Sequence, residues 1–297
     1  VPMLVGVALS AALTIATYAL ALELGAGMSA QSREDAARVA ALLSMGCSAL
    51  RYQTADPMSH AATALAVTVA FTLALRTSRH AIVGLLLGAI LCTRPVSTLP
   101  ILVVAIVLLR KSTRREALTV AAGMLPGLAL LLAAQHAATG SFFASTQHAY
   151  YATSDGPPGC FRYGFGGGVG CVHEHGDFVR ARLAHGFGLR EALGTTLRRL
   201  HAHLSDALDA WPVLVLALPA CFAAARKNRS LRVAWLLVGL QVLAYAPFYF
   251  DGDYPGAGAR FFADVLPIEH AALPVSLALV LPAIAFSDRK SGGEGKR

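Results

Sequence analysis

Two glycine-rich stretches hold most of the side chains that could do chemistry in this chain. The first, GCFRYGFGGGVGCVHEHGD, ends with possible metal ligands at every second position, namely Cys171, His173, His175 and Asp177. In an oxidising compartment, Cys160 and Cys171 would form a disulfide that contributes about 2–3 kcal/mol. Two alternatives remain open: an extended strand would align the four side chains as zinc ligands, and a polar turn would need neither. We predict the disulfide and no metal.

The second stretch, YFDGDYPGAGARFFADVLP, places Arg260 among glycines and aromatic residues that include Tyr254. A guanidinium can hold a phosphate through two parallel hydrogen bonds. The alternative is an arginine that only reaches toward lipid headgroups. Arg94 presents the same choice, because it interrupts an apolar stretch and would cost about 2.5–3.5 kcal/mol at the centre of a bilayer. We expect Asp56 to be its partner.

The composition indicates which kind of protein must position these residues. Of the 297 residues, 56% are hydrophobic and 14% are charged, whereas soluble domains contain about 25% charged residues. The net charge of +8 lies in small clusters between apolar stretches. It does not form the basic, aromatic-rich surface of a nucleic-acid binder, so we expect no nucleic-acid partner.

The apolar stretches predict an all-α, multi-pass transmembrane bundle, because a helix needs about 20 apolar residues to cross about 30 Å of hydrocarbon. The eight expected segments are 2–22, 57–75, 81–92, 96–109, 117–138, 211–225, 233–250 and 265–286. Segments 81–92 and 96–109 are short and meet near Arg94. The chain thus divides into membrane helices (1–138), a large extracytoplasmic loop (139–210), further membrane helices (211–286) and a disordered tail (287–297).

Clusters of lysine and arginine predict how this bundle is oriented. The clusters at 76–79, 110–115, 226–232 and 289–297 would all face the cytoplasm. The first residue and the tail would then be cytoplasmic, and residues 23–56, 139–210 and 251–264 would lie outside. The segment 23–56 is expected to hold an interfacial helix capped by Ser32. Because the spans contain few ionisable groups, we expect chemistry at the outer face and not a transport pathway.

Four segments resemble the GT-C superfamily of membrane glycosyltransferases, of the protein-mannosyltransferase type. They are MGCSALRYQTADPMSH (45–60), GLLLG with TRP (84–95), ATGSF (138–142) followed by the tyrosine pair 150–151, and GARF with LP (258–267). The resemblance implies transfer of a sugar from a polyprenyl-phosphate donor to an unspecified acceptor, at the outer face of a bacterial inner membrane. It further implies that Arg260, and after it Arg94, stabilise the leaving phosphate.

The remaining roles are also implied by this resemblance. A carboxylate would act as general base; the acidic residue of the family is expected upstream of residue 1, with Asp56 as a weaker candidate. Independently of the resemblance, the outer loops offer four further candidate substrate-binding residues: Tyr254, His173, His175 and Asp177. The expected partners are membrane lipid and the lipid-linked donor, and the donor is the only cofactor-like molecule expected. The alternative function is a non-catalytic carrier or binding protein for a lipid-linked saccharide.

Overall fold

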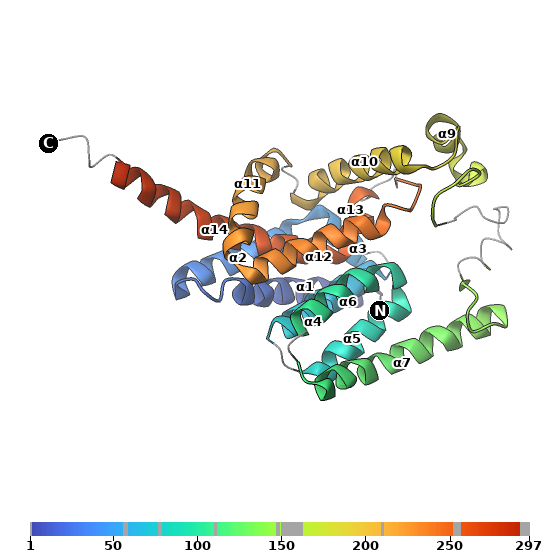
Figure 1. The fold of residues 1–297 in the computed structure, drawn as a ribbon, viewed down its shortest axis with the longest axis horizontal. Coiled ribbons are helices and arrows are strands. Elements are labelled where there is room, and N and C mark those ends of the chain that lie inside the picture. The colour runs from blue at the N-terminus through green and yellow to red at the C-terminus, as the bar shows by residue number, and fades with distance from the viewer. Residues whose placement is uncertain are drawn as a thin grey trace.

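The computed structural model describes residues 2–55, 59–76, 79–109, 112–146, 149, 163–208, 211–251 and 257–291. These residues are helical almost throughout, and no strand occurs among them (Figure 1). The helices are α1 (Pro2–Leu24), α2 (Ala30–Gly46), α3 (Ser48–Ala55), α4 (His60–Leu75), α5 (His80–Thr93), α6 (Pro95–Leu109), α7 (Arg114–Thr139), α9 (Val172–Arg182), α10 (Leu189–Leu208), α11 (Trp211–Lys227), α12 (Arg229–Tyr245), α13 (Ala257–Phe262), the 3-10 helix η1 (Ala263–Val265) and α14 (Leu266–Ser291). The predicted all-α class is therefore confirmed.

Among the described residues, three stretches of helix are long and apolar enough to cross a membrane alone: Leu4–Leu24, Arg114–Thr139 and Arg260–Leu281. The other predicted spans form shorter helices. For example, α4 has 16 residues and so reaches about 24 Å, less than the hydrocarbon thickness of about 30 Å. The chain thus has helices typical of a membrane protein, but the described residues do not confirm all eight predicted membrane segments.

The predicted break near Arg94 is confirmed. Helix α5 ends at Thr93 and α6 begins at Pro95, with Arg94 between them in a non-helical conformation (φ −145°, ψ 80°). Proline disfavours helical geometry in the residue before it and lacks an N–H group, so a Thr-Arg-Pro sequence ends one helix and begins another. The backbone of Arg94 stays hydrogen-bonded at the break, because its N–H donates to the Ile90 carbonyl at 2.7 Å and its carbonyl accepts from the Ser97 amide at 3.0 Å.

Glycines join α5 to α7. Gly84 and Gly88 on α5 face Gly123 and Gly127 on α7, and a Cβ added at Gly127 would lie 2.1 Å from the Gly88 carbonyl. Small residues spaced four apart let two helix backbones approach closely, as in membrane helix pairs. Gly127 is the only residue that α7 buries, so α7 is attached to the bundle through this contact.

The predicted orientation is wrong at the first helix. Glu23, predicted outside, forms an ion pair of 2.6 Å with Arg76, predicted inside. Asn228, from another predicted cytoplasmic cluster, donates to the Leu24 carbonyl at 3.0 Å. At the other end of α1, Gly6 lies against the backbone of Thr54. We call the end with Glu23, Arg76 and Asn228 the basic end, and the end with Gly6, Thr54 and Arg94 the loop end.

The packing of α2 explains this difference. It buries a face of small residues, Ala36, Ala37, Ala40 and Ser44, and it packs against α1 and α14. The segment therefore belongs to the bundle, and it is not the interfacial helix that its charges suggested. Its cap also differs from the prediction, since Ser29 is the N-cap and accepts a hydrogen bond from the Ser32 amide. The first half of α14, fully buried from Ile268 to Ala272 except for Glu269, lies in the middle of the bundle.

Candidate functional site

A buried ion pair lies at the loop end, where α5 gives way to α6. Arg94 is 11% exposed, and its Nε lies 3.3 Å from Oδ2 of Asp264, which is fully buried in η1. Its Nη1 lies 3.2 Å from Nε2 of His60 at the start of α4, and its Nη2 donates to the hydroxyl of Tyr245 at the end of α12. Three separate elements, η1, α4 and α12, thus converge on one guanidinium.

Further polar side chains surround Asp264. The Ser97 hydroxyl donates to the same Oδ2, and the Gln241 amide donates to Ser97 at 3.0 Å. The second oxygen, Oδ1, is buried and has no hydrogen-bond partner in the described part of the chain, and the same holds for Nδ1 of His60. Buried polar atoms are rarely left without a partner. These two atoms therefore mark places where a ligand or a water molecule can hydrogen-bond.

Sequence reasoning found Arg94 but missed its partners. The expected partner, Asp56, lies outside the described residues, and the carboxylate that binds Arg94 is Asp264. A signal was available, because Asp264 lies inside the segment 258–267 that carries the family resemblance. His60 could also have been predicted as a partner, because it ends the segment 45–60 that carries the same resemblance. Tyr245 and Gln241 lie in an apolar helix whose pattern gives no hint of this role.

Arg260 lies on α13, close to the same site. Its guanidinium stacks on the ring of Phe261 at 5.0 Å. The guanidinium of Arg199, on α10, lies 4.9 Å from the same ring. Phe261 therefore lies beside two arginines and is itself buried. Tyr254, the aromatic residue predicted to act with Arg260, lies outside the described residues.

Helix α10 holds the end of α12 and the residues that follow it, up to Asp251. The buried guanidinium of Arg199 donates to the backbone carbonyls of Tyr245, Phe248 and Phe250. Burial lowers the pKa of Arg199 to about 10. Arg198 forms an ion pair of 2.7 Å with Asp251. A basic helix thus orders the backbone immediately before the segment that contains Arg260.

A second contact joins α10 to α14. Nε2 of His203 lies 2.7 Å from Oε2 of Glu269, in the first turn of α14. The His203 ring also meets the edge of Phe262 at 5.3 Å. Glu269 therefore contacts α10.

The extended strand that would align zinc ligands is absent, because Val172–Arg182 forms helix α9. Nδ1 of His175 lies 2.9 Å from the Tyr249 hydroxyl, and its ring stacks on Phe250 at 3.7 Å. Asp177 is fully exposed and pairs with Arg180, so it does not join the Arg94 site. The side chain of His173 lies outside the described residues. Within those residues, no group of three or more potential ligands could hold a metal.

The cysteines divide into two kinds. Cys47, Cys92 and Cys221 are thiols. Cys171 is fully buried beside Val169 and Val179. Cys160 lies outside the described residues, so the pairing of these two residues stays a prediction.

Comparisons with known proteins give no match. No family model, no curated protein and no solved structure is significantly similar to this chain. The function must therefore be argued from the site itself.

Proposed function

We propose that the chain is a membrane glycosyltransferase, or a part of one, that uses a polyprenyl-phosphate-linked sugar. One observation carries the proposal: the three sequence segments that end at His60, Thr93-Arg94-Pro95 and Leu266-Pro267 meet at the Arg94–Asp264 pair. These segments are up to about 200 residues apart in the chain and resemble a glycosyltransferase pattern in their order. Their convergence is what a shared site requires.

The arrangement supports a site for a phosphate group. Asp264 and Tyr245 fix the orientation of the Arg94 guanidinium, and Arg260 lies on the neighbouring helix. Fixed positive charge is most effective where developing negative charge is shielded from water, as on a departing phosphate. In this proposal Arg94 and Arg260 stabilise the polyprenyl phosphate as the sugar leaves.

The proposal includes the membrane arrangement. The shorter apolar helices α4, α5, α6, α11 and α12 would cross beside the three long ones, tilted or with the membrane locally thinned. The loop end would face outward from a bacterial inner membrane, and a disulfide between Cys160 and Cys171 would close the loop there. The apolar helices support this placement, because Leu118, Leu125 and Leu130 of α7 are all more than half exposed.

The ion pairs of the carboxylates favour a second function. In it, the chain is a non-catalytic carrier or binding protein for the same lipid-linked sugar. Asp264 pairs with Arg94, Asp251 with Arg198, and Glu269 with His203. A general base needs a carboxylate that can accept a proton from the acceptor. Among the described acidic residues around the Arg94 site, each is already engaged by a basic side chain.

Sugar release in proteoliposomes distinguishes the two functions. The purified chain is supplied with radiolabelled polyprenyl-phosphate mannose, and free or transferred mannose is measured over time. A glycosyltransferase should release the sugar, and Arg94→Gln should slow the release by about 100-fold. Arg115→Gln, an exposed arginine at the start of α7, serves as the control and should change nothing. Donor binding without release would indicate the carrier, and absence of binding would contradict both.

A further inference from the structure

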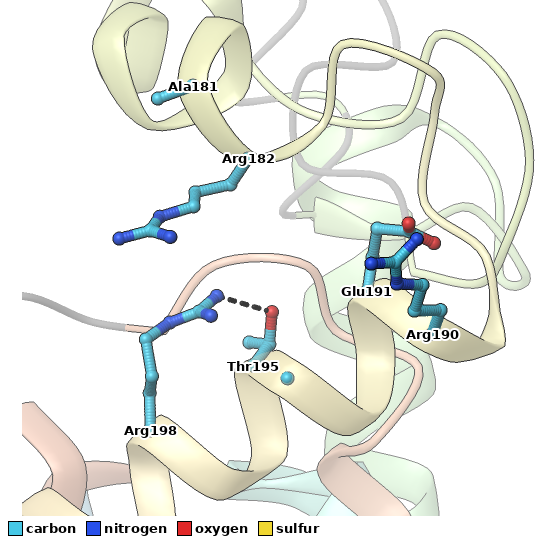
Figure 2. Close-up of a pocket in the computed structure, with 7 residues that line it drawn as sticks. Ala181, Arg182, Arg190, Glu191, Thr195 and Arg198 are labelled. Atoms are coloured by element: carbon cyan, nitrogen blue, oxygen red, sulfur yellow. Dashed lines mark hydrogen bonds between the residues drawn. The ribbon is translucent and has the colours of Figure 1, made fainter.

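A pocket on α10 lies apart from the Arg94 site. It has a volume of about 380 Å³ and lies between the end of α9 and the first half of α10 (Figure 2). Three arginines and one acidic residue line it, namely Arg182, Arg190, Arg198 and Glu191. Figure 2 shows Arg182 extending from α9 toward Arg198 on α10, with Arg190 and Glu191 farther along the helix.

The pocket carries positive charge that the described side chains do not neutralise. Arg198 is held by Asp251 at 2.7 Å and by the Thr195 hydroxyl at 3.0 Å. Glu191 accepts from the Gly188 amide at 3.0 Å and so caps the start of the helix. Within the described part of the chain, Arg182 and Arg190 form neither an ion pair nor a hydrogen bond. Two guanidiniums are thus available to an anion.

An exposed apolar stripe runs beside this pocket on the same helix. Leu189, Leu193 and Leu197 are 80%, 62% and 57% exposed, respectively. Their spacing of four residues places them on one face, and the pocket-lining positions 190, 194 and 198 each follow one residue later, on the adjacent face. The opposite face is buried, through Thr195, Arg199 and His203. Exposed leucines next to arginines are typical of a helix that lies at a membrane surface.

We propose that this pocket binds the phosphate of an anionic phospholipid headgroup in the leaflet at the loop end. Arg182 and Arg190 contact the phosphate, and the leucine stripe contacts the acyl chains. The charge of the pocket matches the phosphate, and the neighbouring leucines match the lipid to which that phosphate belongs. The site does not depend on sugar transfer, and it would anchor α10 and, through Arg198 and Asp251, the connection to α13.

Native mass spectrometry of the purified full chain tests the proposal. The protein in detergent is titrated with phosphatidylglycerol, and the fraction of lipid-bound protein is measured. The double variant Arg182→Gln/Arg190→Gln should weaken binding about tenfold or more, because each arginine near an anionic headgroup contributes appreciably. The matched control is Arg180→Gln, on α9 like Arg182. The guanidinium of Arg180 binds Asp177 outside the pocket. This control should bind as the wild type does.

Two further measurements identify the source of the phosphate. Leu193→Ser/Leu197→Ser should also weaken phosphatidylglycerol binding, whereas inorganic phosphate at the same concentration should not compete with the lipid. Since all four substituted residues are exposed or line an open pocket, thermal unfolding should remain at the wild-type temperature. Unchanged lipid binding in the arginine double variant would overturn the proposal. Competition by inorganic phosphate without an effect of the leucine variant would also overturn it, in favour of a soluble phosphate ligand.

Discussion

Arg94 and Asp264 are two charged groups buried away from water. Their contacts must compensate for the free energy of hydration that burial removes. Removing ions from water costs several kcal/mol for each ion, and only good geometry with further hydrogen bonds offsets this cost. Here His60, Tyr245 and Ser97 supply those bonds. A buried pair of this kind contributes little net stability, so in the proposed function its value lies in orienting the guanidinium for the phosphate.

The first prediction separates the cost of an unpaired charge from the value of the pair. Asp264→Ala leaves a buried guanidinium without its carboxylate and should lower the free energy of unfolding by about 3–5 kcal/mol. The double variant Arg94→Leu/Asp264→Leu removes both charges and should recover most of that loss. Denaturant unfolding of the purified protein in detergent measures both. The matching single variants are Arg94→Leu and Asp264→Leu. If the double variant loses as much stability as these two together, the pair is not coupled as described.

The second prediction concerns the role of Arg260. Arg260→Lys keeps the charge but loses the planar donor pair, so donor binding should weaken. Arg260→Ala should weaken it more, since a hydrogen bond to a charged group contributes about 1.5–3 kcal/mol. Binding of polyprenyl-phosphate mannose to purified protein measures both changes. Wild-type affinity in Arg260→Ala, together with less folded protein, would make Arg260 a structural anchor for α13.

At the scale of elements, some features follow from the sequence and others do not. The break between α5 and α6 follows from Thr93-Arg94-Pro95, because proline acts locally on the residue before it. The burial of α2 does not follow from the sequence, because it depends on which helices pack against its alanine-rich face. The alternation at residues 171–177 left a zinc alternative open for a similar reason: spacing alone does not decide between a strand and α9. Arg94 could be identified from the sequence, because an arginine within an apolar stretch is energetically costly in a membrane. Its partner could not, because that depends on tertiary packing.

The third prediction tests the contact between α5 and α7. Alanine favours a helix over glycine by about 1 kcal/mol, so Gly→Ala should stabilise wherever space permits. Gly239, on α12, has nothing within 4 Å of an added Cβ and should gain stability on substitution. Gly127→Ala places its methyl group against the Gly88 backbone and should instead lose about 1–3 kcal/mol. Thermal unfolding of both variants measures the difference, and equal gains would show that α7 does not pack there.

For the whole molecule, the two ends of the bundle differ in character. The basic end carries Arg76, Asn228 and the turn after α1, whereas the loop end carries the Arg94 site and lies nearest to α9 and α10 (Figure 1). The sequence correctly grouped Arg76 and Asn228 at one end, since both contact the end of α1, and which side of the membrane this end faces stays a prediction. It misplaced the turn after α1, because the short range between Glu23 and Arg33 mixes both signs of charge.

The fourth prediction follows from this arrangement. Gly27 lies in the exposed turn at the basic end, and Ser112 lies two residues before α7 at the same end. Ser141 lies two residues after α7, at the loop end. In intact cells, a membrane-impermeant thiol reagent should label Ser141→Cys. It should leave Gly27→Cys and Ser112→Cys unlabelled, with the wild-type cysteines as background. Labelling of both Gly27→Cys and Ser141→Cys would put the turn after α1 outside, as the basic clusters predicted. That result would contradict the arrangement in which Glu23 pairs with Arg76.

The central claim, that the Arg94 site binds the phosphate of a lipid-linked sugar, is tested most directly by photolabelling. A polyprenyl-phosphate mannose analogue with a photoreactive group next to the phosphate is added to the purified protein, irradiated, and the labelled peptides are mapped. The account predicts labelling of peptides that contain His60, Arg94 or Arg260–Asp264, reduced by excess unlabelled donor and by Arg94→Gln. Labelling that excess donor does not reduce, or that falls only on the lipid-facing surface of α7, would contradict it.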